Sequence, residues 1–180
     1  MRTHIMSAAL ALAVLAPSAH AQQSGAAQEG FAANAAQSST AEILISNLAL
    51  AKSESPQVEN FAEMMISEHT HTNKTLARLA QENDITLPAI PSQEQMQTIQ
   101  RLQTLSGEEF DQAYLQHQLQ SHQKSISLFQ QGAQSAQSEE LQRFAKMHLP
   151  LLQAHHQVAQ QIASELGVST AEGGTASTDR

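Results

Sequence analysis

Histidines and acidic residues recur at helical spacing along this sequence, and such a set has the chemistry of a transition-metal site. The stretch SEHTHTN at 67–73 holds two histidines and one glutamate, shortly after two methionines. An α-helix advances about 100° per residue, so His69 and His71 point roughly 200° apart and cannot bind one ion from a regular helix. His69 lies within the apolar stripe of this segment, whereas His71 is expected at the surface and Glu68 at the edge of the stripe.

The same angular count finds ligand-type residues on the apolar stripes of the other long helical segments. The polar residues that face inward in addition to His69 are Glu42, Asp111, Gln118, His122, His148 and His155. His117 and His156 fall outside their stripes and are expected at the surface. Because a buried polar group costs free energy unless it finds a partner, the inward residues must pair with one another, hold water or bind an ion.

The heights of these residues along their helices decide which of them meet. Glu42 lies about 12 residues before the expected turn at 53–55, and His69 lies about 14 residues after it. The two side chains are therefore expected at one level. His122 reaches the same level in both of the arrangements that the sequence allows for the last two long helices.

The two arrangements differ in the residue that completes the set. If the turn near residue 135 lies beside the turn at 53–55, His148 joins this level. If the segment 83–105 crosses over and reverses the third long helix, His155 joins it instead. Either way, one carboxylate and three imidazoles form a suitable ligand set for one ion of Fe, Cu, Mn or Zn.

Two functions stay open on this basis. The first is a metal-binding protein that serves storage or stress protection through its inward Glu and His residues. The alternative is a structural or protein-interaction module of the cell envelope, in which Glu42 pairs with a protonated histidine in a metal-free hydrogen-bond network. The sequence has no glycine-rich phosphate loop and no GxSxG motif, so a conventional hydrolase or transferase is not supported. A redox enzyme would need an open coordination position on the ion.

The elements that position these residues are all expected to be helices, since Ala and Gln are abundant and no strand pattern occurs. Ser55 and Pro56 supply an N-cap and a first-turn proline, and capping-box patterns begin at Ser92 and Ser106. The predicted helices cover about residues 28–53, 56–82, 92–104, 106–131 and 138–167, and Pro150 is expected to kink the last one. We therefore predict an all-α fold, a four-helix bundle with a short extra helix between the second and third long helices.

The N-terminus has the pattern of a secretory signal peptide. Arg2 precedes an apolar run, Pro17 breaks it, and small residues lead to a cleavage site after Ala21. We predict a signal peptide at 1–21, a flexible leader at 22–27, the helical bundle at 28–167 and a disordered tail at 168–180. Export to the periplasm follows from this prediction.

Composition, net charge and hydropathy limit the classes of partner and ligand that we expect for this chain. The formal net charge is −8 and no basic stretch occurs, so nucleic acid is not an expected partner. The chain has no cysteine, which excludes disulfides and thiolate ligands. No segment has the length and hydropathy of a transmembrane helix, because the N-terminal apolar run is too short. Envelope proteins are the expected class of partner, and the oligomeric state is not indicated.

Three stretches resemble the exported bacterial family called domain of unknown function 4142: AEILISNLALAKSESPQVENFAEMMISEHTHTNKTLARLA, LSGEEFDQAYLQHQLQSHQKSISLFQQGA and LQRFAKMHLPLLQAHHQVA. The likeness spans about residues 27–165 and implies a ferritin-like helical bundle, usually with a signal peptide, for which no activity is established. The positions typical of the family are Glu42, His69, Asp111, Tyr114, His122 and His155. His148 is not among them, which favours the crossover arrangement.

The sequence departs from the di-iron members of the ferritin-like class. Those proteins use Glu-x-x-His on two helices, but Ile66 and Leu152 stand three residues before His69 and His155. A di-iron oxidase site is therefore not expected, whereas a site for a single ion is. Asp111 and Tyr114 would either orient a histidine from behind or tie their helix to a neighbour.

Overall fold

The computed structural model describes residues 19–136 and 138–169, with side chains from residue 30 onward. The described residues form five helices and no strand: α1 (Ala19–Lys52), α2 (Pro56–Glu82), α3 (Gln93–Gln103), α4 (Gly107–Ser135) and α5 (Glu139–Glu165). The predicted all-α class is therefore confirmed. The predicted signal peptide lies mostly outside the described residues, the predicted leader 22–27 falls within α1, and the domain boundaries stay a prediction.

Local sequence signals explain most of the helix starts. Ser55 caps α2, with its hydroxyl accepting a hydrogen bond from the backbone N–H of Val58. The predicted capping box at Ser92 is present at the start of α3. The one predicted at Ser106 is wrong, since Ser106 makes no side-chain cap bond with any described residue. The chain enters α4 through Gly107 at a φ of 56°, a conformation that glycine adopts without strain.

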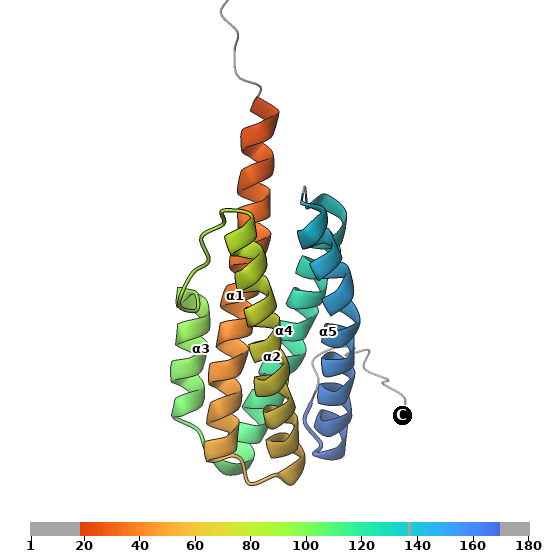
Figure 1. Cartoon of the computed structure of the whole chain (residues 1–180). Helices are drawn as coiled ribbons and strands as arrows, with labels where there is room; N and C mark the ends of the chain where they lie inside the picture. The colour runs from red at the N-terminus through yellow and green to blue at the C-terminus, as the bar shows by residue number, and fades with distance from the viewer. Residues whose placement is uncertain (1–18, 137, 170–180) are drawn as a thin grey trace, which may run out of the picture.

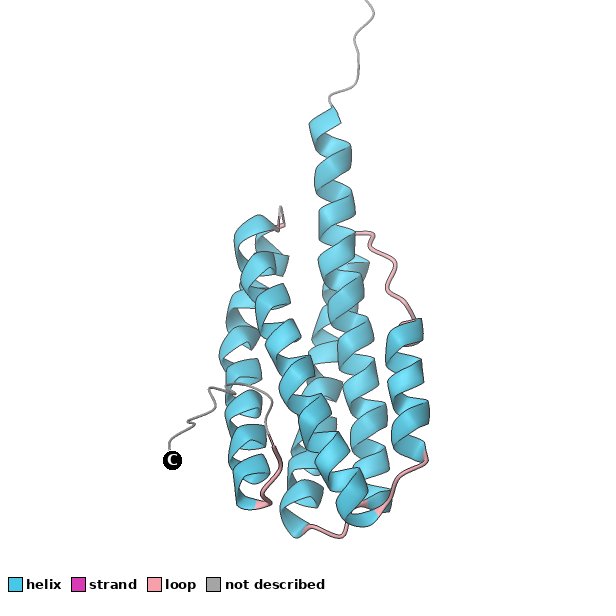
Figure 2. Cartoon of the chain, turned by 180° about the vertical axis from the view of Figure 1, so that it is seen from behind, coloured by secondary structure: helices cyan, strands magenta, loops and turns pink. Residues whose placement is uncertain are grey.

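The four long helices lie side by side, and α3 lies along the outside of α1 (Figures 1 and 2). α1 packs against α2 and α4, and α5 packs against the same two helices. In Figure 1, α1 descends, α2 rises, α3 descends and α4 rises again. The Lys52 ammonium donates to the backbone carbonyl of Leu105 at 3.0 Å, which fixes the start of α4 beside the turn between α1 and α2. Of the two arrangements left open by the sequence, the structure has the crossover one.

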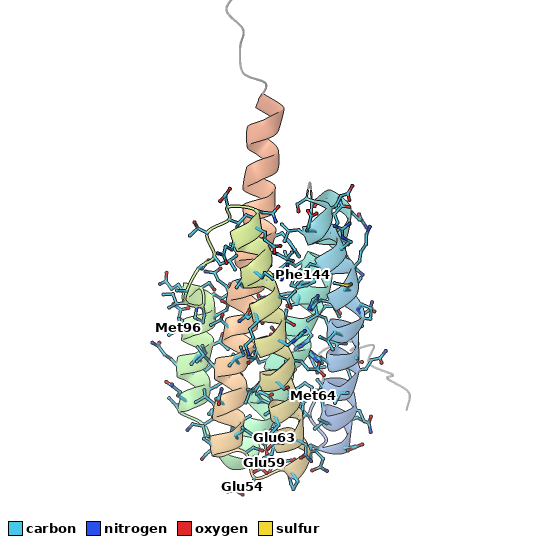
Figure 3. All side chains as sticks on the ribbon, viewed as in Figure 1. Glu54, Glu59, Glu63, Met64, Met96 and Phe144 are labelled. Carbon is cyan, nitrogen blue, oxygen red and sulfur yellow. The ribbon has the colours of Figure 1, made fainter. Side chains whose placement is uncertain are left out.

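Two apolar clusters fill the space between the long helices. One cluster contains Phe61, Met65 and Phe110, and the other contains Phe129 and Phe144. Figure 3 shows Phe144 near the upper end, far from Glu54 at the lower turn. Each fully buried large apolar side chain contributes about 1.5–3 kcal/mol to folding, so both clusters hold the four helices in register.

A layer of buried polar residues separates the two clusters. Along each long helix, the residues pass from one apolar cluster through polar positions to the other cluster. The buried polar residues of this layer are Ser39, Glu42, Ser46, His69, Thr72, Gln118, His122, Ser125 and His155. None of the described helices has the length and hydropathy needed to cross a membrane.

Candidate metal centre

Three histidines from three helices meet in the polar layer. α2 contributes His69, α4 contributes His122 and α5 contributes His155, with exposed fractions of 6%, 1% and 1%. One ring nitrogen from each lies within 4.8 Å of the others. The ring centroids are 5.4–6.0 Å apart. The meeting of His122 with His155, rather than His148, follows from the crossover arrangement of α4.

Hydrogen bonds fix the orientation of two of these rings. His122 Nδ1 lies 2.9 Å from the backbone carbonyl of Gln118, an acceptor, so this nitrogen carries the proton and donates it. His155 Nε2 lies 2.5 Å from a carboxylate oxygen of Glu68, which is likewise an acceptor when ionised. In both rings the remaining nitrogen therefore keeps its lone pair.

Ser39 sets the tautomer of the third ring. The Ser39 hydroxyl donates its single proton to the backbone carbonyl of His69 at 3.1 Å. The same oxygen lies 3.1 Å from His69 Nδ1. When the hydroxyl proton is on the carbonyl, its oxygen accepts from His69 Nδ1–H, and His69 Nε2 keeps a lone pair.

The three remaining nitrogens are the chemical core of the site. His69 Nε2, His122 Nε2 and His155 Nδ1 are buried and have no hydrogen-bond partner among the described residues. Leaving a buried acceptor unsatisfied costs about 1–3 kcal/mol each, and lone pairs that face one another also repel. A cation removes both costs. A tetrahedral ion with bonds of about 2.1 Å places its nitrogen ligands about 3.4 Å apart, which is shorter than the upper limit of 4.8 Å for the present separations.

The electrostatic environment favours the neutral, metal-binding form of His69 and His155. Burial lowers the pKa of His69 from 6.5 to about 3, and the neighbouring imidazoles contribute in the same direction. Burial also lowers the pKa of His155, although its hydrogen bond to Glu68 works in the opposite direction. Near pH 7 no proton needs to leave His69 before an ion binds.

Glu42 lies beside the three histidines but does not join their group. Its carboxylate accepts hydrogen bonds from Gln118 Nε2 at 2.7 Å and from the Ser121 hydroxyl at 2.5 Å. Burial raises the pKa of Glu42, but the histidines around it and the Ser121 hydroxyl outweigh burial, so its pKa lies below the ordinary value. A buried negative charge is therefore held next to the histidines. Binding of the same ion by Glu42 stays a prediction.

The prediction that His117 lies at the surface is wrong. Its side chain is 16% exposed, and Nε2 lies 3.8 Å from a carboxylate oxygen of Glu42. The angular count treated each helix as one of four, whereas α3 adds a fifth element that covers this face of α4. His156 is half-buried, against the same prediction, and His71 is exposed as predicted.

His148 lies outside the histidine group. Its Nδ1 is 2.9 Å from the backbone carbonyl of Phe144, and its ring packs against the Phe144 ring at a tilt of 36°, with centroids 4.2 Å apart. These contacts place the His148 side chain against the apolar cluster that contains Phe144, about two turns before His155 on α5. Glu68 was missing from the predicted site residues, although its position at the edge of the stripe was recognised.

Asp111 and Tyr114 contact other parts of the fold. The Tyr114 hydroxyl hydrogen-bonds with the Ser46 hydroxyl at 3.2 Å. The Asp111 carboxyl lies against Ser53 and the backbone of Glu54, at the turn between α1 and α2. His122 follows Tyr114 by two turns of α4, about 12 Å along the axis. The contacts of both residues fit a tie between α4 and α1 better than support of a ligand from behind.

Other proteins of solved structure have a similar fold. The DUF305 protein from Streptomyces coelicolor is similar at a TM-score of 0.70 and 13% identity, over 82% of this chain and 98% of that one. A conserved hypothetical protein from Mycobacterium tuberculosis is similar at a TM-score of 0.63 and 16% identity, over 87% and 99%. At these identities the likeness concerns the fold alone.

Comparison with known sequences gives the family. None of the curated protein sequences matches this chain. The sequence profile described as Domain of unknown function (DUF4142) matches residues 13–162, which is most of the chain. The resemblance seen in the sequence is thereby confirmed, and the chain belongs to the DUF4142 family.

Proposed function

We propose that this chain is an exported metal-binding protein that holds one transition-metal ion between His69, His122 and His155, for storage or for protection against metal stress. One observation carries the proposal. Three buried ring nitrogens with free lone pairs lie close together, and no described residue hydrogen-bonds to them. Export to the periplasm rests on the signal-peptide pattern at 1–21.

The architecture supports a ferritin-like four-helix bundle as the scaffold. α2 and α4 run in the same direction and are joined by the segment that contains α3, and such bundles have one long crossover connection. The polar layer lies midway between two apolar clusters, as expected for a site built in a bundle core. The ligands proposed here are imidazoles rather than paired carboxylates, which separates this site from the di-iron class.

The donor set narrows the choice of ion. Imidazole nitrogen suits Zn, Cu and Fe, whereas Mn prefers carboxylate and water oxygen. The Glu68 carboxylate, the Gln118 carbonyl and the Ser39 hydroxyl accept the other ring N–H groups, an arrangement that ligating histidines almost always have. Three protein ligands leave at least one coordination position for water or a small molecule.

The alternative is a structural or interaction module of the envelope with a metal-free polar network. A network of that kind requires the inward groups to satisfy one another. Gln118 and Ser121 do satisfy Glu42. The histidines do not satisfy one another within the described chain, and this favours the metal-binding reading.

Thermal unfolding with and without a chelator tests the proposal. An ion that binds only the folded state at 100 times its Kd adds about 2.7 kcal/mol to the free energy of unfolding. We expect Zn²⁺ or Cu²⁺ to raise the midpoint of the mature protein and EDTA to reverse the rise. His69→Ala should show a smaller rise than the wild type, because it loses the three-histidine site, whereas His71→Ala, on the same helix but exposed, should show the full rise. A midpoint that no metal moves would contradict the proposal.

A further inference from the structure

Glu42 also neighbours a histidine that lies outside the three-histidine group. His117 comes from α4, and its Nε2 lies 3.8 Å from Glu42 Oε1. This nitrogen is buried and makes no hydrogen bond with any described residue. The amide oxygen of Gln118 is buried and unsatisfied in the same way, although its amide nitrogen donates to Glu42. Two unsatisfied atoms thus adjoin one buried carboxylate.

The separation between His117 Nε2 and Glu42 Oε1 is compatible with an ion bound by both atoms. A distance of 3.8 Å between Nε2 and Oε1 is too long for a hydrogen bond. Two ligands of one ion with bonds of about 2.1 Å lie about 3.4 Å apart in tetrahedral geometry and up to about 4.2 Å apart when they are opposite each other. The observed distance falls in that interval. Glu42 supplies charge, and the hydrogen bonds from Gln118 and Ser121 hold its orientation.

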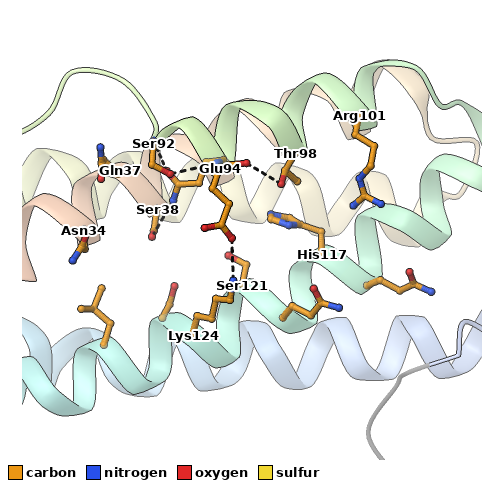
Figure 4. A pocket seen from close by; sticks show the side chains of 15 residues that line it. Asn34, Gln37, Ser38, Ser92, Glu94, Thr98, Arg101, His117, Ser121 and Lys124 are labelled. Carbon is orange, nitrogen blue, oxygen red and sulfur yellow. Dashed lines mark hydrogen bonds and ion pairs between the residues drawn. The ribbon is translucent and has the colours of Figure 1, made fainter.

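A polar pocket gives solvent and ions access to this place. Figure 4 shows the pocket between α1, α3 and α4, with His117 and Ser121 among the residues that line it. Its volume is about 490 Å³. Two cationic side chains, Lys124 and Arg101, line the pocket. Lys124 is 3.3 Å from the Glu94 carboxylate, which offsets its charge, whereas the Arg101 charge acts against a cation at His117. Water in the pocket could complete the coordination of an ion held by His117 and Glu42.

We propose that Glu42 and His117 hold a second divalent transition-metal cation, at the pocket side of the polar layer and separate from the three-histidine site. The mixed imidazole and carboxylate donors suit Zn²⁺, Fe²⁺ or Co²⁺. This position goes beyond the three-histidine site, because its ligands are His117 and Glu42, neither of which joins the group of His69, His122 and His155.

Titration with Co²⁺ tests this position, with visible absorption and equilibrium dialysis as the two readouts. We expect the mature wild-type protein to bind two equivalents. His117→Ala and Glu42→Gln should each bind one, because each removes one ligand of the second position. Two variants are used so that a folding defect in either one, detected by circular dichroism, leaves the other to decide. His71→Ala is the matched control and should bind two.

The outcomes separate the two sites. A double variant, His69→Ala with His155→Ala, should retain the equivalent that His117→Ala loses. If that double variant still binds as much Co²⁺ as the wild type while His117→Ala loses one equivalent, the second position stands and the three-histidine site fails. If the folded His117→Ala and Glu42→Gln proteins bind as much Co²⁺ as the wild type, the second position is overturned.

Discussion

The carboxylate of Glu68 lies 2.5 Å from Nε2 of His155, and this contact between α2 and α5 determines which nitrogen of the ring faces the other two histidines. With Nε2 donating to the carboxylate, Nδ1 is left with a lone pair. The bond therefore positions a ligand without itself contacting the ion. It also ties the two helices at the level of the site.

Replacing Glu68 with Gln should weaken metal binding without removing a ligand. The amide is neutral and can present its N–H₂ group to the ring, so the preference for a free Nδ1 is lost. Removal of such a supporting partner typically costs 10–100-fold in metal affinity. Competition with a chromophoric chelator measures this change. Glu63→Gln, an exposed position on the same helix that Figure 3 labels near the lower end, should leave the Kd unchanged, and an equal effect in both variants would contradict the supporting role.

The order of metal affinities should follow the imidazole donors. We expect Cu²⁺ to bind most tightly, Zn²⁺ next, Fe²⁺ more weakly and Mn²⁺ weakest, since N-donor sites follow this series and Mn²⁺ gains little from imidazole. Competition titrations under anaerobic conditions give the ranking. Tight Mn²⁺ binding would indicate a carboxylate-dominated site and would count against the three-histidine assignment.

Acid should destabilise the metal-free protein through His69. In the folded state the pKa of His69 is about 3, whereas its unperturbed value is 6.5. Between these values the unfolded chain binds a proton that the folded chain does not, so unfolding takes up protons. The free energy of unfolding should therefore fall as the pH drops below about 6.5 and continue to fall toward pH 3. Urea titrations in this range measure the slope.

A leucine at position 69 isolates this contribution. His69→Leu removes the titrating group and keeps an apolar side chain in the layer, so its stability should depend less steeply on pH than that of the wild type. His71→Ala should keep the wild-type slope, because His71 is exposed. Identical slopes in wild type and His69→Leu would show that His69 is not held neutral by burial.

Gly132 offers a test of the packing that carries the site. A Cβ atom added there would lie 2.5 Å from the Phe31 ring, closer than any real contact. Overpacking of this kind costs about 1–3 kcal/mol, whereas Gly→Ala inside a helix returns at most about 1 kcal/mol. Gly132→Ala should therefore destabilise the protein, as measured by urea unfolding. Gln130→Ala, exposed on the same helix, should have little effect, and a more stable Gly132→Ala protein would contradict this packing.

The sequence could predict the helices and most of the inward residues because both depend on local periodicity. His69, His122 and His155 share the period of the apolar residues around them, and the structure buries all three. The choice between His148 and His155 needed the direction of α4, which the residues alone left open and the family resemblance only favoured.

Other features depended on contacts between helices and could not be read from one helix at a time. His117 is covered because α3 packs outside the four long helices, which an angular count on α4 does not see. Glu68 reaches His155 across the interface of α2 and α5, so its role depends on knowing that these two helices are neighbours. Its place at the edge of the α2 stripe was the one available signal.

The central claim is that the three histidines hold a metal ion, and the metal content of the purified protein tests it most directly. The mature chain would be prepared from the periplasm without a histidine tag and analysed by elemental mass spectrometry, beside His69→Ala and His122→Ala. The account predicts close to one equivalent or more of Zn, Cu or Fe in the wild type, and one equivalent less in each variant. Wild-type protein that is metal-free and takes up none of the added ions would contradict it, and the buried histidines would then serve the architecture of the fold alone.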